Sequence, residues 1–380
     1  MIVVEALPAR GGDCLWVEWD DEDSRRRRML IDGGWGGNNA LTPALRDRFA
    51  RQPSTSRDFD LVVCTHVDDD HIGGLLGLLT SPPDGFTARD IWFNGSVHLG
   101  SVPGADDTLG GRSGRHLAAL LRDRNLPWNR ATDGRPVVVP STGALPTFRL
   151  PGLTLTLLSP TWDRLRALGK IWPPETPAQE LMADVLSDDV MKIPWRWLAN
   201  TPYVADRSPA NGSSIAFCAE HGDGSRVLFS ADAHAEVLVS SLHRLKSTGR
   251  YHIDVCKVPH HGSAANMSPA LLGRLDCGNW LVSTHGGNVI HPASQESQYR
   301  PGEGRHPSAR AMARIIFLAN SRPTFWFNYR SASTERYDDN LLATEFGFRV
   351  EYPLRAGIGI TVAVERGEVF RGGSAASGQA

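Results

Sequence analysis

Two histidines and three aspartates crowd one short stretch, Cys64-Thr65-His66-Val67-Asp68-Asp69-Asp70-His71-Ile72-Gly73-Gly74, directly after the apolar run LVV. Adjacent carboxylates repel one another, and a divalent cation would remove that repulsion and use the imidazoles as well. Residues two apart in an extended turn face the same side, so His66, Asp68 and Asp70 can project together while Asp69 points away. His71 follows at the expected start of a helix. The stretch therefore predicts ligands for two neighbouring metal ions.

Three other segments repeat the pattern of an apolar run that ends in Asp or His: RVLFSADAH, VCKVPHHGS and LVSTHGGNVIHP. The ends of strands let a rigid sheet present side chains from loops. Mixed imidazole and carboxylate ligands suit Zn²⁺, Mn²⁺ or Fe²⁺. We expect these loops to converge on the His66 stretch.

The elements that must position these residues are short apolar strands and amphipathic helices. Val, Ile and Leu dominate runs such as MIVVEAL, DCLWVEW, RMLIDGG, DLVVCTH, VVVP, LTLTLLSP and NWLVSTH. Helical periodicity marks residues 42–51, 114–124, 235–247, 268–276 and 306–320, and Pro43, Pro269 and Pro307 are each placed at a first helical position. These patterns predict an α/β fold with two mixed sheets and helices packed outside.

The composition is that of a globular protein. The 380 residues are 41% hydrophobic and 22% charged, with a net charge of −2, so no global basic field recruits nucleic acid. No run is long enough for a membrane span, and the N-terminus lacks a basic signal region, so we expect no membrane association and a cytoplasmic location. The five cysteines form no CxxC pair and are expected to be buried thiols.

We expect a single domain over residues 1–368, followed by a disordered tail at 369–380. Residues 161–210 have a different texture, with four tryptophans and many prolines, and are interpreted as an insertion that shapes the site, forms a lid or binds a partner protein. The charged turn Asp20 to Arg28 carries four consecutive arginines. It is interpreted as a solvated hairpin tip, with phosphate contact as the alternative.

Four ordered blocks resemble the metallo-β-lactamase fold superfamily. HVDDDHIGG is similar to its HxHxDH signature, with Asp68 at the second histidine. The other blocks are Leu30 to Gly34, Asn211 to Ile215 followed by RVLFSADAH, and Lys257 to Ser263. This ordered set is similar to the soluble hydrolase-like domain of ComEC-type DNA-uptake proteins. The resemblance implies that residues 1–368 form a four-layer αββα sandwich, in which two mixed sheets lie between helices.

The resemblance also implies roles for individual residues. His66 and Asp68 match the ligands of one metal, Asp70 and His71 match those of the other, and Asp232 matches the acid that bridges them. His260 or His261 matches the last histidine; we favour His260 as the ligand and His261, with Asp70, as catalytic. His98 is the candidate for a third imidazole at the first metal. The expected supporting or substrate-contacting residues are Asp32, Asn211, Ser263 and His306, with His291 as the competitor of His306.

One departure from the family pattern bears on the metal. Asp68 replaces an imidazole with a harder, charged ligand, which keeps Mn²⁺ and Fe²⁺ open beside Zn²⁺, the default. Asp68 also adds negative charge, which disfavours anionic substrates unless two cations are bound. Ala231, where glycine is common, is expected to be tolerated.

These residues predict a hydrolase that uses two divalent ions to activate water. A phosphodiester in a nucleotide or nucleic acid is the favoured substrate, with Lys257 and the arginine turn as phosphate partners. Hydrolysis of a neutral ester, lactone or amide is the first alternative. A non-catalytic, partner-binding member of the fold is the second, and a large exposed tryptophan patch within 161–210 would favour it.

Overall fold

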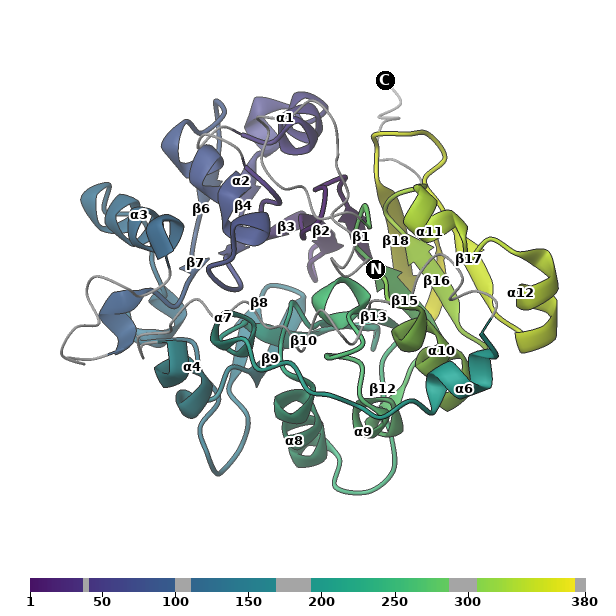
Figure 1. The fold of residues 1–380 in the computed structure, drawn as a ribbon. Coiled ribbons are helices and arrows are strands. Elements are labelled where there is room, and N and C mark those ends of the chain that lie inside the picture. Colours follow the sequence, from purple (N-terminus) through teal and green to yellow (C-terminus); the bar gives the residue numbers. More distant parts are fainter. Residues whose placement is uncertain (37–40, 100–110, 169–192, 287–305, 373–380) are drawn as a thin grey trace.

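The computed structural model describes residues 1–36, 41–99, 111–168, 193–286 and 306–372. Within these ranges two large mixed sheets face each other (Figure 1). The first sheet has the order β19 (Glu368–Arg371), β18 (Ile360–Glu365), β1 (Ile2–Ala6), β2 (Leu15–Asp20), β3 (Arg26–Ile31), β5 (Leu61–Val63) and β7 (Ile91–Trp92). Its strands β3, β5 and β7 are parallel and the others pair antiparallel.

The second sheet combines a parallel half with an antiparallel half. Its order is β17 (Arg349–Glu351), β16 (Thr324–Phe327), β15 (Asn279–Val282), β13 (Val255–Lys257), β11 (Arg226–Phe229), β10 (Ala216–His221), β9 (Leu153–Ser159) and β8 (Thr147–Leu150). Strands β11, β13, β15, β16 and β17 run parallel, whereas β8, β9, β10 and β11 pair antiparallel. Two short ladders flank the sheets: β4 (Asp58–Phe59) with β6 (Thr87–Ala88), and β12 (Tyr251–His252) with β14 (Leu275–Asp276).

Alternation along the strands of the first sheet separates two cores. Val17, Met29 and Val63 point to the inner face and join the main core with residues of the second sheet such as Leu157 and Phe217. The intervening residues of the first sheet point outward and pack under α1 (Pro43–Ala50), α2 (Asp69–Thr80) and α3 (Gly111–Asp123).

Apolar residues of α8 (Ala235–Leu245), α9 (Pro269–Arg274) and α10 (Ala309–Leu318) join the main core from the other side of the second sheet (Figure 1). This arrangement confirms the predicted four-layer sandwich of two mixed sheets between helices. The remaining helices are α4 (Trp162–Leu168), α6 (Trp195–Ala199), α7 (Pro209–Gly212), α11 (Ala332–Glu335) and α12 (Asn340–Phe346). None of the helices in the described ranges is long and apolar enough to cross a membrane.

Several local predictions need correction. Helix α10 begins at Ala309 rather than at Pro307, because Ser308 caps it by accepting a hydrogen bond from the backbone N–H of Arg310. In the run VVVP, Val139 makes only an isolated bridge to Thr161. The domain does not end at 368, because β19 continues to Arg371 and pairs with β18; residues 373–380 lie outside the described part.

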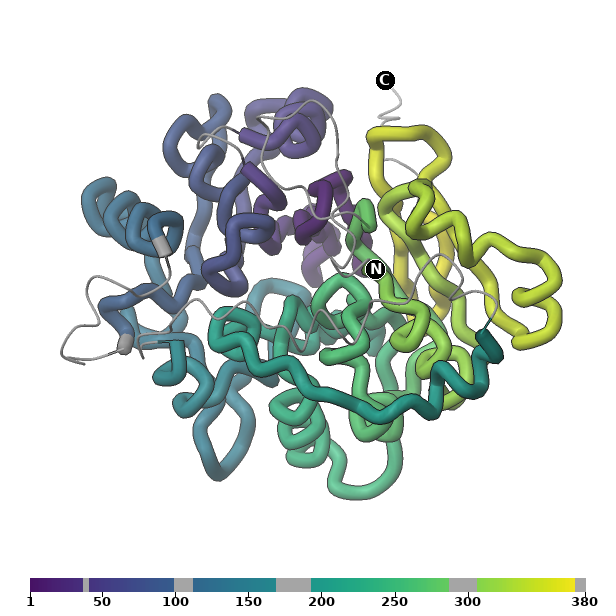
Figure 2. The backbone as a smooth tube through the Cα atoms, in the orientation of Figure 1, coloured from purple at the N-terminus to yellow at the C-terminus, as the bar shows by residue number. Residues whose placement is uncertain are grey.

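The end of the predicted insertion packs on the body of the protein. Trp195 is buried, and its ring lies 6.0 Å from that of Tyr337 and 6.3 Å from that of Phe348. From α6 the chain crosses the face of the molecule to α7 (teal in Figure 2). Residues 169–192, including Trp172, lie outside the described part. All five cysteines are buried, unpaired thiols, as expected.

Candidate metal centre

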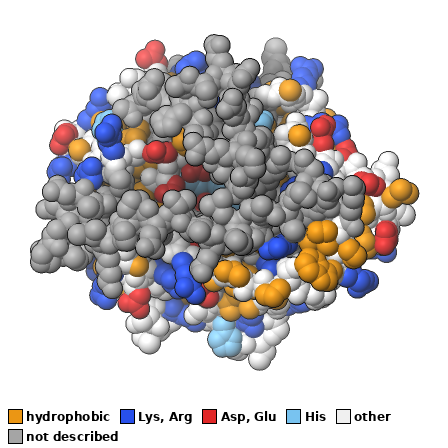
Figure 3. All heavy atoms as spheres, in the orientation of Figure 1, with side chains coloured by type: hydrophobic (Ala, Val, Ile, Leu, Met, Phe, Trp, Pro, Cys, Tyr) orange, Lys and Arg blue, Asp and Glu red, His pale blue; other side chains and the backbone are white. Residues whose placement is uncertain are grey.

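The carboxyl ends of parallel strands from both sheets meet at one edge. Asp32 follows β3, His66 follows β5, and α2 begins three residues after His66. From the second sheet, Asp232 follows β11, and the pair His260–His261 follows β13. The two parallel halves thus bring together residues that are up to 229 positions apart in the sequence, counting from Asp32 to His261. Acidic and histidine side chains are visible in a hollow near the centre of this face (Figure 3).

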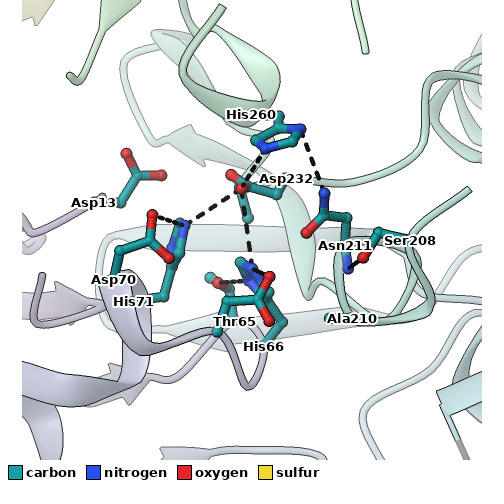
Figure 4. Close-up of polar contacts among 12 residues, drawn as sticks. Asp13, Thr65, His66, Asp70, His71, Ser208, Ala210, Asn211, Asp232 and His260 are labelled. Carbon is teal, nitrogen blue, oxygen red and sulfur yellow. Dashed lines mark hydrogen bonds and ion pairs between the residues drawn. The ribbon is translucent and has the colours of Figure 1, made fainter. Parts of the chain in front are cut away.

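Four imidazoles surround one carboxylate oxygen. The Nε2 atoms of His66, His71, His260 and His261 lie 3.9, 3.4, 3.8 and 3.4 Å from Oδ2 of Asp232. In Figure 4, Asp232 stands between His260 on one side and His66 and His71 on the other. Ligands about 2.1 Å from a tetrahedral cation lie roughly 3.4 Å from one another, so these separations match atoms that share a metal ion.

Each of these imidazoles has its other ring nitrogen, Nδ1, next to an oxygen atom. The partners are Thr65 Oγ1 for His66 (3.0 Å), Asp32 Oδ2 for His71 (2.8 Å), Asn266 Oδ1 for His260 (2.9 Å) and Ser283 O for His261 (2.9 Å). A proton on Nδ1 that is donated to such an oxygen leaves Nε2 as the lone-pair donor of the neutral ring. The four rings are therefore oriented to coordinate through Nε2.

Two aspartates complete two sets of ligands. Asp68 Oδ2 lies 3.5 Å from Nε2 of His66, and Asp70 Oδ2 lies 3.5 Å from Nε2 of His261 and 3.9 Å from that of His71. Asp69 instead accepts a hydrogen bond from Ser113 on α3, so it points away as expected.

The residues of this cluster suit divalent cations for two reasons: some of their polar atoms lack hydrogen-bond partners, and their side chains are common metal ligands. Nε2 of His66 and Oδ1 of Asp232 are buried and have no hydrogen-bond partner among the described residues. Such groups are costly to bury without a partner, and a cation would supply one. The four imidazoles and three carboxylates are also the donor set that Zn²⁺, Mn²⁺ and Fe²⁺ accept.

Without a cation, the charges of the cluster balance one another. Burial alone would raise the pKa of Asp232, but the imidazoles of His261 and His71 hold it well below its usual range. Burial opposes a charge on His260, yet Asp232 and Asp206 raise its pKa to about 9. A cation must therefore displace protons from the imidazoles, which makes binding weaker as the pH falls.

Next to Asp232 lies a buried ion pair between Asp13 and Lys257, which was not predicted from the sequence. Asp13, in the loop before β2, places Oδ2 2.5 Å from Nζ of Lys257 and Oδ1 3.5 Å from Nδ1 of His261. Nζ of Lys257 is also 3.7 Å from Oδ1 of Asp232. Asp13 forms a compact cluster of potential ligand atoms with His71, Asp232 and His261. The sequence signal, an Asp after Gly11–Gly12, is too common to mark it.

The basic side chains that the sequence offered for phosphate contact are already engaged. Lys257 is fully buried against Asp13. The arginine turn is paired throughout with acids: Arg25 with Asp23, Arg26 with Asp20, Arg27 with Asp21 and Asp60, and Arg28 with Glu18 and Asp58. Neither feature supplies a cation at the site, because Lys257 is held by Asp13 and the arginine turn lies at the start of β3, whereas Asp32 follows the end of that strand.

Two predicted site residues have their contacts elsewhere. His98 lies in a 3₁₀ turn, where its Nδ1 accepts from the backbone N–H of Gly95 and its ring packs edge-on against Trp128, 4.9 Å away. Burial lowers the pKa of His98 to about 4, so the ring is neutral in that pocket. The hydroxyl of Ser263 accepts from the backbone N–H of Ala265. Neither side chain joins the cluster around Asp232, and His291 lies outside the described part of the chain.

The other expected supporting residues lie at the site. Asp32 is fully buried and accepts from the N–H and hydroxyl of Thr65 as well as facing Nδ1 of His71. Nδ2 of Asn211 lies 3.3 Å from Nδ1 of His260. The ring of His306 lies 5.2 Å from that of His260.

Glycines allow the loops to approach α2. A Cβ atom added to Gly12 would lie 1.7 Å from the carbonyl oxygen of Asp70, and one added to Gly74 would lie 1.9 Å from that of Gly33. The glycines of the HIGG stretch therefore serve backbone packing that places Asp70 and His71 against the first sheet.

Comparison with known proteins supports the fold. A model of the metallo-beta-lactamase superfamily matches residues 7–152, which carry β2, β3, β5 and α2 with the first half of the site. This match supports the metallo-β-lactamase superfamily, whose members bind divalent metals, and the metal-dependent hydrolases as the class. The narrower likeness to ComEC-type domains stays a prediction. No curated protein matches the chain.

The solved structures found by comparison are distant. One described as a new diphosphatase from the PhnP family is 11% identical, with 95% of this chain and 96% of that chain covered and a TM-score of 0.39. A possible metal-dependent hydrolase from Veillonella parvula DSM 2008 is 9% identical, with 98% and 99% covered and a TM-score of 0.39. A metallo-beta-lactamase HARLDQ-motif mutant from Cronobacter sakazakii is 14% identical, with 67% and 75% covered and a TM-score of 0.30. At these identities and scores, nothing about the substrate follows.

Proposed function

We propose that this protein is a metal-dependent hydrolase that binds two divalent cations and cleaves a phosphodiester bond of a nucleotide or nucleic acid. The observation that carries the proposal is the convergence of four imidazole Nε2 atoms, three of them on buried rings, on one oxygen of Asp232. The first set of ligands is His66, Asp68 and His260. The second set is Asp70, His71 and His261, and Asp232 lies between the two sets.

This assignment differs from our expectation for the histidine pair. His261, expected to be catalytic, lies 3.2 Å from His71 and 3.5 Å from Asp70, so it belongs with the second set. His260 then takes the place in the first set for which His98 was the candidate. His306, beside His260, is left as the side chain that can contact the substrate or its leaving group.

When bound, the two cations would lower the pKa of a shared water and neutralise charge that develops on the substrate. The protein's own residues hold the rings: Asp32, Thr65, Asn266 and the carbonyl of Ser283 fix the orientation of the four imidazoles. This fixed geometry means that little reorganisation is needed as charge develops.

The charge of the ions and of the carboxylates that reach them is compatible with an anionic substrate. Two divalent cations carry +4 and the carboxylates of Asp68, Asp70 and Asp232 carry −3, which leaves +1 where a phosphodiester would bind, while Asp13 and Lys257 cancel. Asp32 and Asp206, which face the Nδ1 atoms of His71 and His260, add −2 farther from the ions. The cations themselves must therefore attract a phosphodiester, because Lys257 is paired with Asp13. The same centre could also hydrolyse a neutral ester, lactone or amide, so the substrate must be tested directly.

The test is metal content by elemental analysis, together with turnover of bis(p-nitrophenyl) phosphate and a p-nitrophenyl ester under Zn²⁺ or Mn²⁺. We expect about two metal ions per chain and faster turnover of the diester. Asp232→Ala should lose both. Asp276→Ala is the matched control, because Asp276 also faces a histidine, His252, but lies on β14. Equal metal content and turnover in Asp232→Ala and the wild type would refute the proposal, and turnover of the ester alone would move the substrate class to neutral esters.

A further inference from the structure

Asp206 is a buried acid in the segment that runs from α6 to α7, within the stretch predicted to be an insertion. Its backbone N–H donates to the carbonyl of Ala265, next to the loop that carries the histidine pair. This hydrogen bond attaches the segment to the loop region that carries the site.

The carboxylate of Asp206 accepts three hydrogen bonds. Oδ2 accepts from Nδ2 of Asn211 (2.7 Å) and from Nδ2 of Asn266 (3.0 Å), and Oδ1 accepts from the backbone N–H of Ser208 (2.8 Å). Oδ2 also lies 3.5 Å from Nδ1 of His260. Figure 4 shows the amide of Asn211 turned toward His260.

These contacts determine which way the amide of Asn266 points. Its Nδ2 faces three acceptors: Oδ2 of Asp206 and the carbonyls of Asp232 and Ala233, at 3.0, 3.2 and 3.3 Å. Its Oδ1 must then face Nδ1 of His260, at 2.9 Å. A carbonyl at that position requires a proton on Nδ1 and leaves Nε2 free to bind a cation.

We propose that Asp206 is a positioning residue of the first set of ligands: by fixing the amide of Asn266, it makes His260 present Nε2 to the cation shared with His66 and Asp68. This inference rests on the proposed function, and it assigns a role within the site to the segment before α7. Asp206 has no contact with the second set of ligands in the described residues, so its effect is confined to one of the two cations.

The test is a Zn²⁺ titration of metal-free protein against a chromophoric chelator, which resolves the two binding events. Asp206→Asn replaces the acceptor of Asn266 with a donor, so we expect one of the two affinities to fall by about 10–100-fold and the other to stay within twofold. Long-range ¹H–¹⁵N NMR of the Zn²⁺-loaded protein should show the Nδ1–H form of His260 in the wild type and its loss in the variant. A structural role alone would leave that signal unchanged.

Asp223→Asn is the matched control. Asp223 also contacts a histidine and accepts backbone hydrogen bonds, but it lies in the turn between β10 and β11. Should Asp206→Asn fail to fold, Asn266→Ala removes the carbonyl that faces His260 and should weaken the same cation.

The outcomes separate the two proposals. Two tight cations in both the wild type and Asp206→Asn would overturn the role of Asp206 and leave the dinuclear centre standing. A wild type that binds no Zn²⁺ or Mn²⁺ would overturn both. An equal loss of affinity for both cations in Asp206→Asn would also overturn the positioning role, because it would show a general loss of structure.

Discussion

Replacement of Lys257 by methionine should destabilise the metal-free protein by about 3–5 kcal/mol, the usual cost of removing one partner of a buried ion pair. The side chain of Lys257 is 0% exposed and that of Asp13 is 2% exposed, and their charged atoms are 2.5 Å apart. Methionine fills a similar volume but leaves Asp13 charged and buried beside Asp232. The loss is thus electrostatic rather than a packing defect.

The measurement is the free energy of unfolding of the metal-free protein in urea, with tryptophan fluorescence as the signal. Arg25→Met is the control within the same chain. Arg25 pairs with Asp23 at 3.3 Å, but the side chain of Arg25 is 72% exposed and that of Asp23 is 68% exposed. We expect that control to cost no more than about 1 kcal/mol. A change below about 1 kcal/mol in Lys257→Met at pH 8 would refute the reasoning.

The pH dependence of the same variant gives a second check. In the wild type, burial would raise the pKa of Asp13, but Lys257 holds it below its usual range. Without Lys257, only His261 and His71 oppose burial, so the pKa of Asp13 rises and the folded variant takes up a proton on Asp13 at a higher pH than the folded wild type does. The destabilisation should therefore shrink as the pH falls from 8 toward 5. Asp13→Asn added to Lys257→Met should restore much of the stability at pH 8.

Three further changes have distinct expected results. Asp32→Asn should lower the affinity for one of the two cations by about 10–100-fold in the same Zn²⁺ titration, because it puts a donor where Nδ1 of His71 needs an acceptor. Ala231→Gly should raise the free energy of unfolding by about 0.5–1 kcal/mol in urea, since Ala231 has φ 46°; unchanged stability would show that the strain is absent. Gly12→Ala should lower metal content by displacing the start of α2, whereas Gly222→Ala, whose added Cβ meets nothing within 4 Å, should not.

The fold and half of the site follow from local sequence patterns. Alternation in runs such as DCLWVEW predicts strands with one face in the core, and an apolar run that ends in His or Asp predicts a ligand at a sheet edge. The His66 stretch is informative because its ligands are neighbours in sequence. Pairing across the sheets then brings Asp232 and the histidine pair to the same place, which the resemblance anticipated.

The remaining residues could not be predicted because their partners are distant in sequence. Asp13 meets Lys257 across 244 positions, and Asp206 acts on His260 across 54. No local pattern distinguishes these acids from solvated ones. His98 illustrates the reverse error: the resemblance made it the candidate for a third imidazole, but a turn closed by its own Nδ1 and a neighbouring tryptophan hold the ring elsewhere.

The histidine pair shows why residue type alone could not assign the ligands. In an extended backbone, successive side chains point to opposite sides, so only one of two adjacent histidines would reach a shared acid. Here His260 and His261 have φ 45° and 53°, the left-handed region that non-glycine residues rarely adopt. Their rings are inclined at 73° and both present Nε2 to Asp232. Backbone strain of about 1–3 kcal/mol at each residue is sustained by the hydrogen bonds to Asn266 and Ser283. The strain is thus the cost of supplying one imidazole to each set of ligands from a single short loop.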